Sequence, residues 1–156
     1  VNSSPTSPGG VDWHYMLANH TLLNPTQVLD VAANNGLTGT FTYSLAGQST
    51  FSSLNGNNVT LLDSSSVAVN FGTQDMSFAL DTDTLGTLQN ATIIDFATFY
   101  SGNGALISDV TGVTGTVGGA FVGTEAQGIT STLWIADDGT TTATVDDYYG
   151  TMVLAR

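Results

Sequence analysis

The stretch Thr114–Gly128 combines the alternation of a β-strand with an unusual density of glycine. Val117 and Phe121 fall on one face of the predicted strand, and Thr116 and Val122 fall on the other. Glycine weakens the interior of a strand, so it usually marks a bend or a close approach of two backbones. The glycines concerned are Gly115, Gly119 and Gly123. Because a closed barrel needs strongly bent strands at its corners, this stretch predicts a barrel corner followed by a tight turn.

Short segments of alternating apolar and polar residues recur along the rest of the chain. They predict strands over Leu37–Leu45, the two arms of a hairpin in Ser65–Leu80, Ala91–Tyr100, Ala105–Ser108, Ile129–Ala136, Thr141–Val145 and Tyr149–Leu154. Turns rich in Gly, Asn and Asp separate them, and strands do not alternate with helices as they do in a parallel sheet. The class is all-β and antiparallel, and the pattern fits both a barrel and a sandwich. We expect an up-and-down β-barrel of about eight strands with at most one short helix.

The remaining segments are assigned from helix and turn signals. Asn24–Asn35 is predicted to be a short helix or an irregular loop, because Pro25 can begin a helix and Gly36 can end one. Asp12–Asn19 fits a strand or a helix, and its aromatic residues favour the strand. The predicted loops are Gln48–Asn58, Asp81–Gly86 and Asp137–Thr140.

The first ten residues differ in composition from the rest of the chain. Val1–Gly10 contains Ser, Thr, Asn, two prolines and a Gly pair, which is typical of a linker. We therefore divide the chain into a linker over residues 1–10 and a single β-barrel domain over residues 11–156, and we expect both to be part of a larger chain. A domain of this length buries a sizeable core without disulfides, and the sequence has no cysteine.

The charge balance excludes two classes of partner. The formal net charge is −12, with no lysine and a single arginine, Arg156. Such a chain cannot neutralise phosphates, so the sequence predicts no nucleic-acid binding and no adhesion to an anionic membrane surface. It also contains no apolar window long enough for a membrane helix. The partners that remain are an unknown protein or a glycan, together with cations.

The segment Gly119–Gly128 resembles a motif of transferrin-binding-protein-like β-barrel domains, Gly-x-Phe-x-Gly-Pro-x-Ala-x-Glu. The hairpin Ser66–Leu80 and the strand Gly39–Leu45 are similar to segments of the same family. From Trp13 onward the chain resembles the C-terminal barrel of bacterial FecR-domain proteins. It departs from the motif at two positions, where the family has Pro and Glu and this chain has Thr124 and Gln127.

The resemblance implies an eight-stranded barrel exported by a Gram-negative-type bacterium to the periplasm or the cell surface. In this family the barrel is a scaffold or a binding module, and its partner-binding loops vary. The positions that match the motif are therefore structural: Gly119, Phe121 and Gly123. We expect Glu125, which lies in the turn, to cap backbone N–H groups with its carboxylate.

Pairs of aspartates are the candidate metal ligands. Asp81 with Asp83, Asp137 with Asp138, and Asp146 with Asp147 supply hard oxygen atoms of the kind that calcium prefers. The segment that begins at Asp81 lacks the glycine and the later glutamate of an EF-hand loop, and aspartate before glycine is equally typical of a turn. The two histidines, His14 and His20, are too few for a structural zinc site in a chain without cysteine. We expect no cofactor, with calcium as the alternative.

The sequence offers no sharp catalytic motif. Glu125 paired with an aspartate has the residue types of a glycosidase, but Glu125 falls in the predicted turn. No serine stands in a Gly-x-Ser-x-Gly elbow, and the glycines of Thr114–Gly128 are followed by neither a lysine nor a helix, as a phosphate-binding loop requires. We therefore predict a protein that is not an enzyme.

Three aromatic residues are the candidate partner-binding side chains. Trp134 lies on the face of its strand opposite Leu133 and Ile135, so it faces solvent if those two residues face the interior. An exposed Trp serves as a sugar-stacking platform or as an interface anchor; the alternative is that the segment Asn24–Asn35 covers it. Tyr148 and Tyr149 can extend the same patch, or one of them can belong to the core.

The sequence supports three functional hypotheses. The first is a non-enzymatic binding or sensory module of an exported bacterial protein. The second is a carrier with a small-ligand cavity inside the barrel, and the third is a structural or adhesive domain stiffened by calcium.

Overall fold

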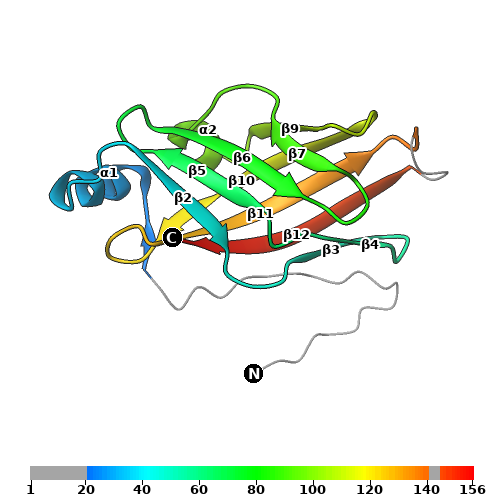
Figure 1. Ribbon diagram of the computed structural model, residues 1–156, viewed down its shortest axis with the longest axis horizontal. Helices are drawn as coiled ribbons and strands as arrows, with labels where there is room; N and C mark the ends of the chain where they lie inside the picture. The colour runs from blue at the N-terminus through cyan, green and yellow to red at the C-terminus, as the bar shows by residue number, and fades with distance from the viewer. Residues whose placement is uncertain (1–20, 141–144) are drawn as a thin grey trace.

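The computed structural model describes residues 21–140 and 145–156. Eight antiparallel strands form a closed barrel (Figure 1), which confirms the predicted fold class. They are β2 (Thr40–Leu45), β5 (Ser66–Asn70), β6 (Asp75–Asp81), β7 (Thr87–Asn90), β9 (Gly104–Ser108), β10 (Val113–Val122), β11 (Gly128–Asp137) and β12 (Asp146–Ala155). Each pairs with the next in chain order, and β12 closes the ring on β2.

A hairpin stands where the sequence predicted a loop over Gln48–Asn58. It consists of β3 (Thr50–Ser53) and β4 (Asn58–Thr60), joined by a turn in which Gly56 has a φ of 81°. The polar side chains that suggested a loop fit this hairpin because only one of its faces is buried. Phe51 and Val59 are buried on that face, and β3 pairs with β12 at Tyr148 and Tyr149.

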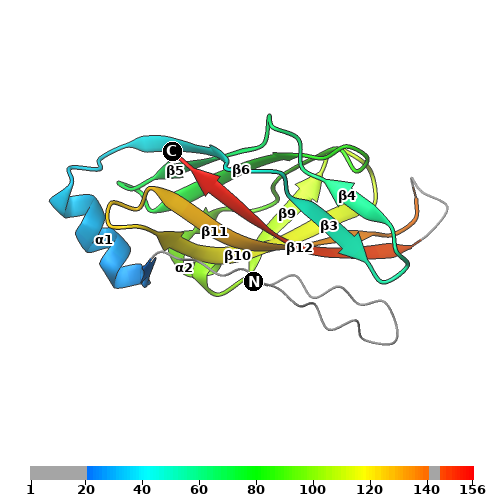
Figure 2. The same ribbon diagram turned by 90° about the horizontal axis from the view of Figure 1, so that it is seen from below.

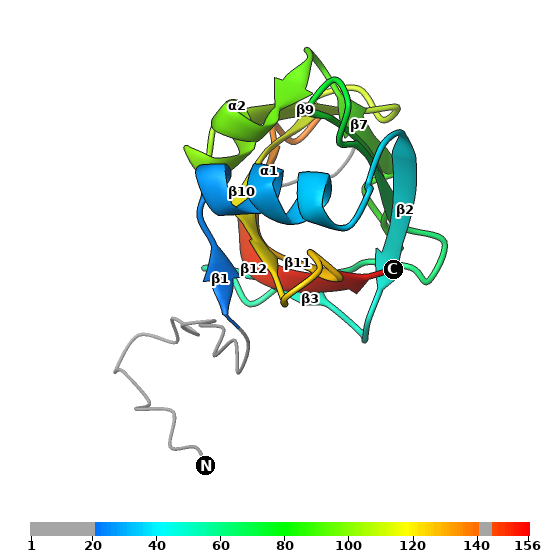
Figure 3. The same ribbon diagram turned by 90° about the vertical axis from the view of Figure 1, so that its left-hand side faces the viewer.

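Helix α1 (Pro25–Asn34) lies across one end of the barrel (Figure 3). The sequence predicted a short helix or an irregular loop here; the segment is a helix, and its N-terminus shows why it forms. The side chain of Asn24 accepts a hydrogen bond from the N–H of Gln27, and the Gln27 side chain accepts one from the N–H of Asn24, both at 2.9 Å. Val28 and Ala32 face the barrel and are buried, so the helix closes this end.

The predicted strand Ala91–Tyr100 is wrong over most of its length. Only β8 (Ile94–Asp95) is a strand, and α2 (Phe96–Tyr100) follows it as a second helix. The Asp95 side chain accepts a hydrogen bond from the N–H of Thr98 at 2.7 Å and thereby begins the helix. The apolar residues of this segment are buried by the helix, with Phe96 and Phe99 both inside.

A hydroxyl group links α2 to the barrel wall. At this end β9 no longer pairs with β10, and the short strand β1 (Leu22–Leu23) pairs with β10 instead. The Tyr100 hydroxyl donates to the carbonyl of Leu23 at 2.6 Å and accepts from the N–H of Phe121 at 3.3 Å. Polar backbone groups next to the end of β9 are satisfied in this way.

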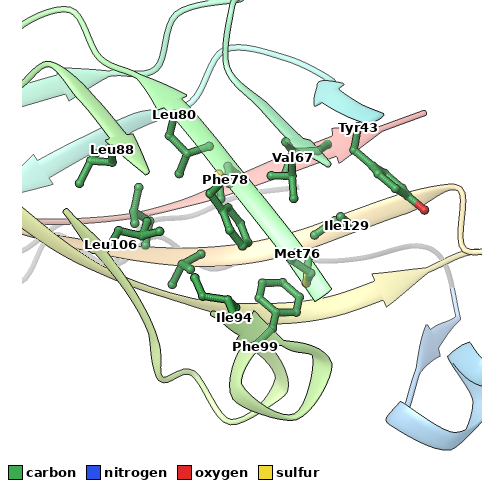
Figure 4. Packing of buried hydrophobic residues seen from close by; sticks show 14 of the residues in the cluster. Tyr43, Val67, Met76, Phe78, Leu80, Leu88, Ile94, Phe99, Leu106 and Ile129 are labelled. Carbon is green, nitrogen blue, oxygen red and sulfur yellow. The ribbon is translucent and has the colours of Figure 1, made fainter. Parts of the chain in front are cut away.

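The inward-facing side chains of the strands form one hydrophobic core, part of which is drawn in Figure 4. At the end covered by α1, Phe121 is fully buried and lies at the centre of a group of aromatic rings. Its ring centroid is 5.1 to 6.3 Å from those of Tyr43, Phe71, Phe96, Phe99 and Tyr100. This packing explains why the motif at the end of β10 needs a large aromatic residue.

Glycine in β10 permits close approach of its neighbours. A Cβ atom at Gly119 would overlap the carbonyl oxygen of Thr130 and lie 2.8 Å from Cζ of Phe99. A Cβ atom at Gly118 would overlap the backbone of Gly102, in the turn after α2. The glycines of this strand therefore make room for the neighbouring strand and for α2.

Other predicted boundaries have mixed outcomes. The strand predicted over Ile129–Ala136 is confirmed as β11, and the hairpin within Ser65–Leu80 is confirmed as β5 and β6. Strand β12 begins at Asp146, earlier than the predicted Tyr149. The linker over residues 1–10, the segment Asp12–Asn19 and most of the predicted strand Thr141–Val145 lie outside the described residues.

Candidate functional site

Trp134 and Tyr149 are neighbours on the outer face of the barrel. They occupy directly paired positions of β11 and β12. Their ring centroids are 6.4 Å apart and their ring planes differ by 19°. Trp134 is 39% exposed and Tyr149 is 50% exposed. The two strands thus present a pair of nearly parallel aromatic rings to solvent, on the side of the barrel where β10, β11 and β12 lie next to one another (Figure 2).

Tyr148 does not belong to this ring pair. It points to the opposite face of β12, is only 6% exposed and pairs with Ile135. Burial raises the pKa of its hydroxyl, and the negative charges of Asp146 and Asp137 raise the pKa further. The structure therefore brings together two of the three predicted aromatic residues and places the third in the interior.

A strip of uncharged side chains continues from the ring pair along β11 and β12. The next pairs on this face are Thr132 with Thr151, Thr130 with Val153, and Gly128 with Ala155. Thr130 and Gly128 are themselves buried, so the exposed part of the strip lies mainly on β12 and at Thr132. The strip ends in an open groove of about 560 Å3 beside the turn between β10 and β11. The groove is lined by Thr21, Ala46, Val122, Gly123, Thr124, Gln127, Gly128, Val153, Leu154 and Ala155.

Sequence reasoning did not find this strip, since it depends on the register between two strands. The signal was present, because each strand shows a run of outward-facing residues without charge. Only the pairing of β11 with β12 shows that these runs lie side by side.

Asp81 and Asp83 fix the connection between β6 and β7. The Asp81 carboxylate accepts a hydrogen bond from the hydroxyl of Thr87 at 2.6 Å. Hydrogen bonds from the side chains of Ser64 and Thr87 lower the pKa of Asp81, against a small opposing effect of burial. The Asp83 carboxylate accepts from the N–H of Thr60 in β4 at 3.0 Å. Both side chains thus serve as hydrogen-bond acceptors within the protein.

Asp137 and Asp138 lie at the turn after β11. Asp137 is buried and accepts a hydrogen bond from the N–H of Gly139 at 3.0 Å. Asp138 is exposed and accepts from both the N–H and the hydroxyl of Thr140, which lower the pKa of its carboxyl. Within the part of the chain that the structure describes, no three His, Cys, Asp or Glu side chains are placed to hold a metal ion.

Asp146, which the sequence named with Asp147 as a candidate metal ligand, is buried and lies opposite Asp137 at the start of β12. Asn57 donates to it at 2.8 Å and Asn55 at 3.2 Å. Burial raises the pKa of this carboxyl, but hydrogen bonds from Asn57, Ser53, the N–H of Asp147 and Asn55 together leave the pKa below its ordinary value. Asp146 therefore ties the β3–β4 turn to β12.

We expect Asp146→Ala to lower the free energy of unfolding by about 1–3 kcal/mol at pH 7, because the side chains that donate to the carboxylate lose their acceptor. A carboxyl whose pKa is lowered by folding stabilises the protein above its unfolded pKa and loses this effect as the pH falls through the folded pKa. The difference between the variant and the wild type should therefore shrink below about pH 4. Urea unfolding measured from pH 7 to pH 3 checks this, and a difference that does not vary with pH would contradict it.

The turn between β10 and β11 holds the remaining motif residues. Gly123 has a φ of 89° and Ala126 a φ of 52°. Among the described contacts, the side chain that accepts from the backbone of this turn is Gln127, whose Oε1 lies 3.0 Å from the N–H of Glu125. The φ of Gly123 is one that residues with a side chain rarely adopt, which explains the glycine at that position.

Tyr43 of β2 and Arg156, which follows β12, hold this turn from outside it. The hydroxyl of Tyr43 donates to the Ala126 carbonyl at 2.6 Å. Burial raises the pKa of Tyr43 to about 12, although the charge and hydrogen bond of Arg156 act in the opposite direction. The Arg156 guanidinium donates to the carbonyl of Glu125 at 2.5 Å and lies 5.1 Å from the ring centroid of Phe41. The single arginine is thus engaged in structure.

No family model matches the sequence, and neither a curated protein nor a solved structure matches it. Among the described residues, no helix is both long and apolar enough to cross a membrane. The function of the site therefore has to follow from its own geometry.

Proposed function

We propose that the chain is a non-enzymatic binding module of an exported bacterial protein, with the ring pair Trp134–Tyr149 at the centre of its contact surface. The observation that carries this proposal is the exposure of two adjacent, nearly parallel aromatic rings on a regular sheet. Aromatic residues dominate the energetics of binding surfaces because they contribute a large contact area at a small cost in side-chain entropy. The paired strands keep both rings in place before a partner arrives.

The interior of the barrel supports a surface site over a carrier function. Near the end covered by α1, the rings around Phe121 lie within van der Waals packing distance of one another. Side chains rather than a ligand thus occupy that part of the interior. The open groove lies beside the outer face, where it adjoins the uncharged strip.

The surface chemistry and the resemblance support export. Charged residues make up 9% of the chain, and the threonine and tyrosine on the strip provide polarity without charge. The motif Gly119–Gly128 forms the end of β10 and the turn into β11, and its resemblance to transferrin-binding-protein-like domains supports the same setting. We propose the periplasm or the cell surface of a Gram-negative-type bacterium as the location.

The experiment compares the wild type with Trp134→Ala and Tyr149→Ala by biolayer interferometry. The immobilised protein is exposed to neutral polysaccharides, acidic polysaccharides and envelope proteins of Gram-negative bacteria. We expect at least one class of partner to bind and to lose about tenfold or more in affinity in each variant. Ile93→Ala, which removes a side chain that is 79% exposed elsewhere on the barrel, is the matched control and should bind normally.

Two results would contradict the proposal. One is binding that neither ring affects. The other is turnover of a glycan or an ester that is lost in Glu125→Gln, since this would make the protein an enzyme.

A further inference from the structure

We propose that the outer face of β11 and β12 binds an extended, uncharged polysaccharide chain, which lies along the strip from the ring pair Trp134–Tyr149 to the groove beside Gly128. This inference rests on the proposed binding function and adds the class of ligand and its direction on the surface. Three features of the strip support it: its length, the order of its side chains and its charge.

The strip is long. From the ring pair it passes through three further pairs of residues on this face and ends at Gly128 and Ala155. Trp134 lies six positions after Gly128 on β11, which corresponds to about 20 Å along a strand. A ligand that contacts both the rings and the groove must therefore be extended, whereas a single sugar or a small metabolite reaches only one of them.

The order of side chains along the strip favours a glycan over a protein. Protein interfaces usually concentrate apolar residues at the centre and polar residues at the rim. Here the pair Thr132–Thr151 lies between the aromatic rings on one side and the apolar side chains of Val153 and Ala155 on the other, so polar groups are not confined to the rim. Aromatic rings pack against the C–H faces of sugar rings. The Thr132 hydroxyl donates to the carbonyl of Gly118, so it can accept a hydrogen bond from a sugar hydroxyl.

The charge of the surface favours an uncharged ligand. The strip between Trp134 and Gly128 carries no ionisable side chain on its outward-facing positions apart from the tyrosine of the ring pair. Asp147 lies on the same face beyond Tyr149, and its negative charge opposes an acidic ligand at that end. Arg156, the only arginine of the chain, already contacts Glu125 and the ring of Phe41. The Asp147 carboxylate therefore disfavours an acidic polysaccharide at that end of the strip.

The test is isothermal titration calorimetry of the full chain with oligosaccharides of increasing length. The neutral series are β-1,4-linked glucose, mannose, xylose and N-acetylglucosamine and α-1,4-linked glucose; oligogalacturonates are the acidic counterpart. For at least one neutral series we expect the affinity to rise with length until the ligand spans about 20 Å and then to level off. The acidic series should bind at least tenfold more weakly.

Two variants separate the ends of the strip. Trp134→Ala should lower the affinity for all lengths of the bound series by about tenfold or more. Val153→Arg, which places a long charged side chain at the groove, should weaken long oligosaccharides severalfold and leave short ones unchanged. Ile93→Ala should match the wild type, and melting temperatures near that of the wild type show that each variant is folded.

Each other outcome overturns the inference in a distinct way. Absence of binding in all neutral series, a preference for the acidic series, or an affinity independent of length each contradict a polysaccharide track. If an envelope protein binds in a Trp134-dependent manner while no neutral series does, the inference fails and the proposed binding function stands. If no partner depends on Trp134, both fail.

Discussion

Phe121→Ala is expected to lower the free energy of unfolding by about 3–5 kcal/mol, the usual cost of truncating a fully buried phenylalanine. The ring of Phe121 lies within 6.3 Å of five other aromatic rings, measured between centroids. Its removal leaves a cavity at the point where α2, β10 and β2 meet, and the rigid strands around it cannot collapse to fill the space. Chemical denaturation followed by circular dichroism measures the loss.

Tyr149→Ala is the matched control for Phe121→Ala. It also truncates an aromatic residue of the sheet, but this side chain is 50% exposed, so its effect on stability should be much smaller. Equal effects of the two variants would contradict the central place of Phe121 in the core.

Gly119→Ala is expected to destabilise the protein by about 1–3 kcal/mol or more, which is the usual cost of forcing extra atoms into a packed site. The new Cβ atom would overlap the Thr130 carbonyl oxygen and lie 2.8 Å from both the Cα of Ser131 and Cζ of Phe99. The Thr130 oxygen and the Ser131 Cα belong to the backbone of β11, so the clash can be relieved only by a shift of the paired strands. The melting temperature should fall accordingly.

The control for Gly119→Ala is Gly47→Ala. No atom lies within 4 Å of the position that a Cβ would take at Gly47. We expect the stability of this variant to stay within about 0.5 kcal/mol of the wild type. If Gly119→Ala were as harmless as its control, glycine at position 119 would not be required by the close approach of β10 and β11.

The outline of the fold was predictable because alternation with period two is a strong signal in this chain. It placed the hairpin of β5 and β6 and the long strand β11, and Pro25 with Gly36 marked α1. It failed where local hydrogen bonds decide between conformations. In Ile94–Tyr100, one bond from the N–H of Thr98 to the side chain of Asp95 begins a helix in a segment whose apolar residues also suit a strand.

The turn between β7 and β8 illustrates the same limit. The side chain of Asn90 accepts from the N–H of Phe78 and donates to the carbonyl of Met76, both at 2.7 Å. It thus takes the place of backbone groups where β7 ends beside β6. No pattern of apolar residues indicates that a side chain will replace backbone hydrogen bonds here, because these bonds join Asn90 to residues of a different strand.

The sequence predicted the orientation of single residues of the candidate site, but not which residues of neighbouring strands lie side by side. Alternation in β11 was sufficient to put Trp134 opposite Leu133 and Ile135, and the side chain is on the outer face. The partnership of Trp134 with Tyr149, rather than with Tyr148, follows from the register between β11 and β12. The same register brings Asp137 opposite Asp146, which no local pattern indicates because the turn between the two residues hides their pairing.

The most direct test of the ring pair as a contact surface uses the fluorescence of Trp134. The chain has two tryptophans, so Trp13→Phe leaves Trp134 as the only one. Quenching by acrylamide is measured with and without a partner whose saturation has been established by calorimetry. We predict that the bound partner shields Trp134, so that acrylamide quenching of its fluorescence falls. Because Tyr149→Ala weakens binding, the same partner concentration should reduce quenching less in this variant. Unchanged quenching of Trp134 under saturating partner would contradict the account.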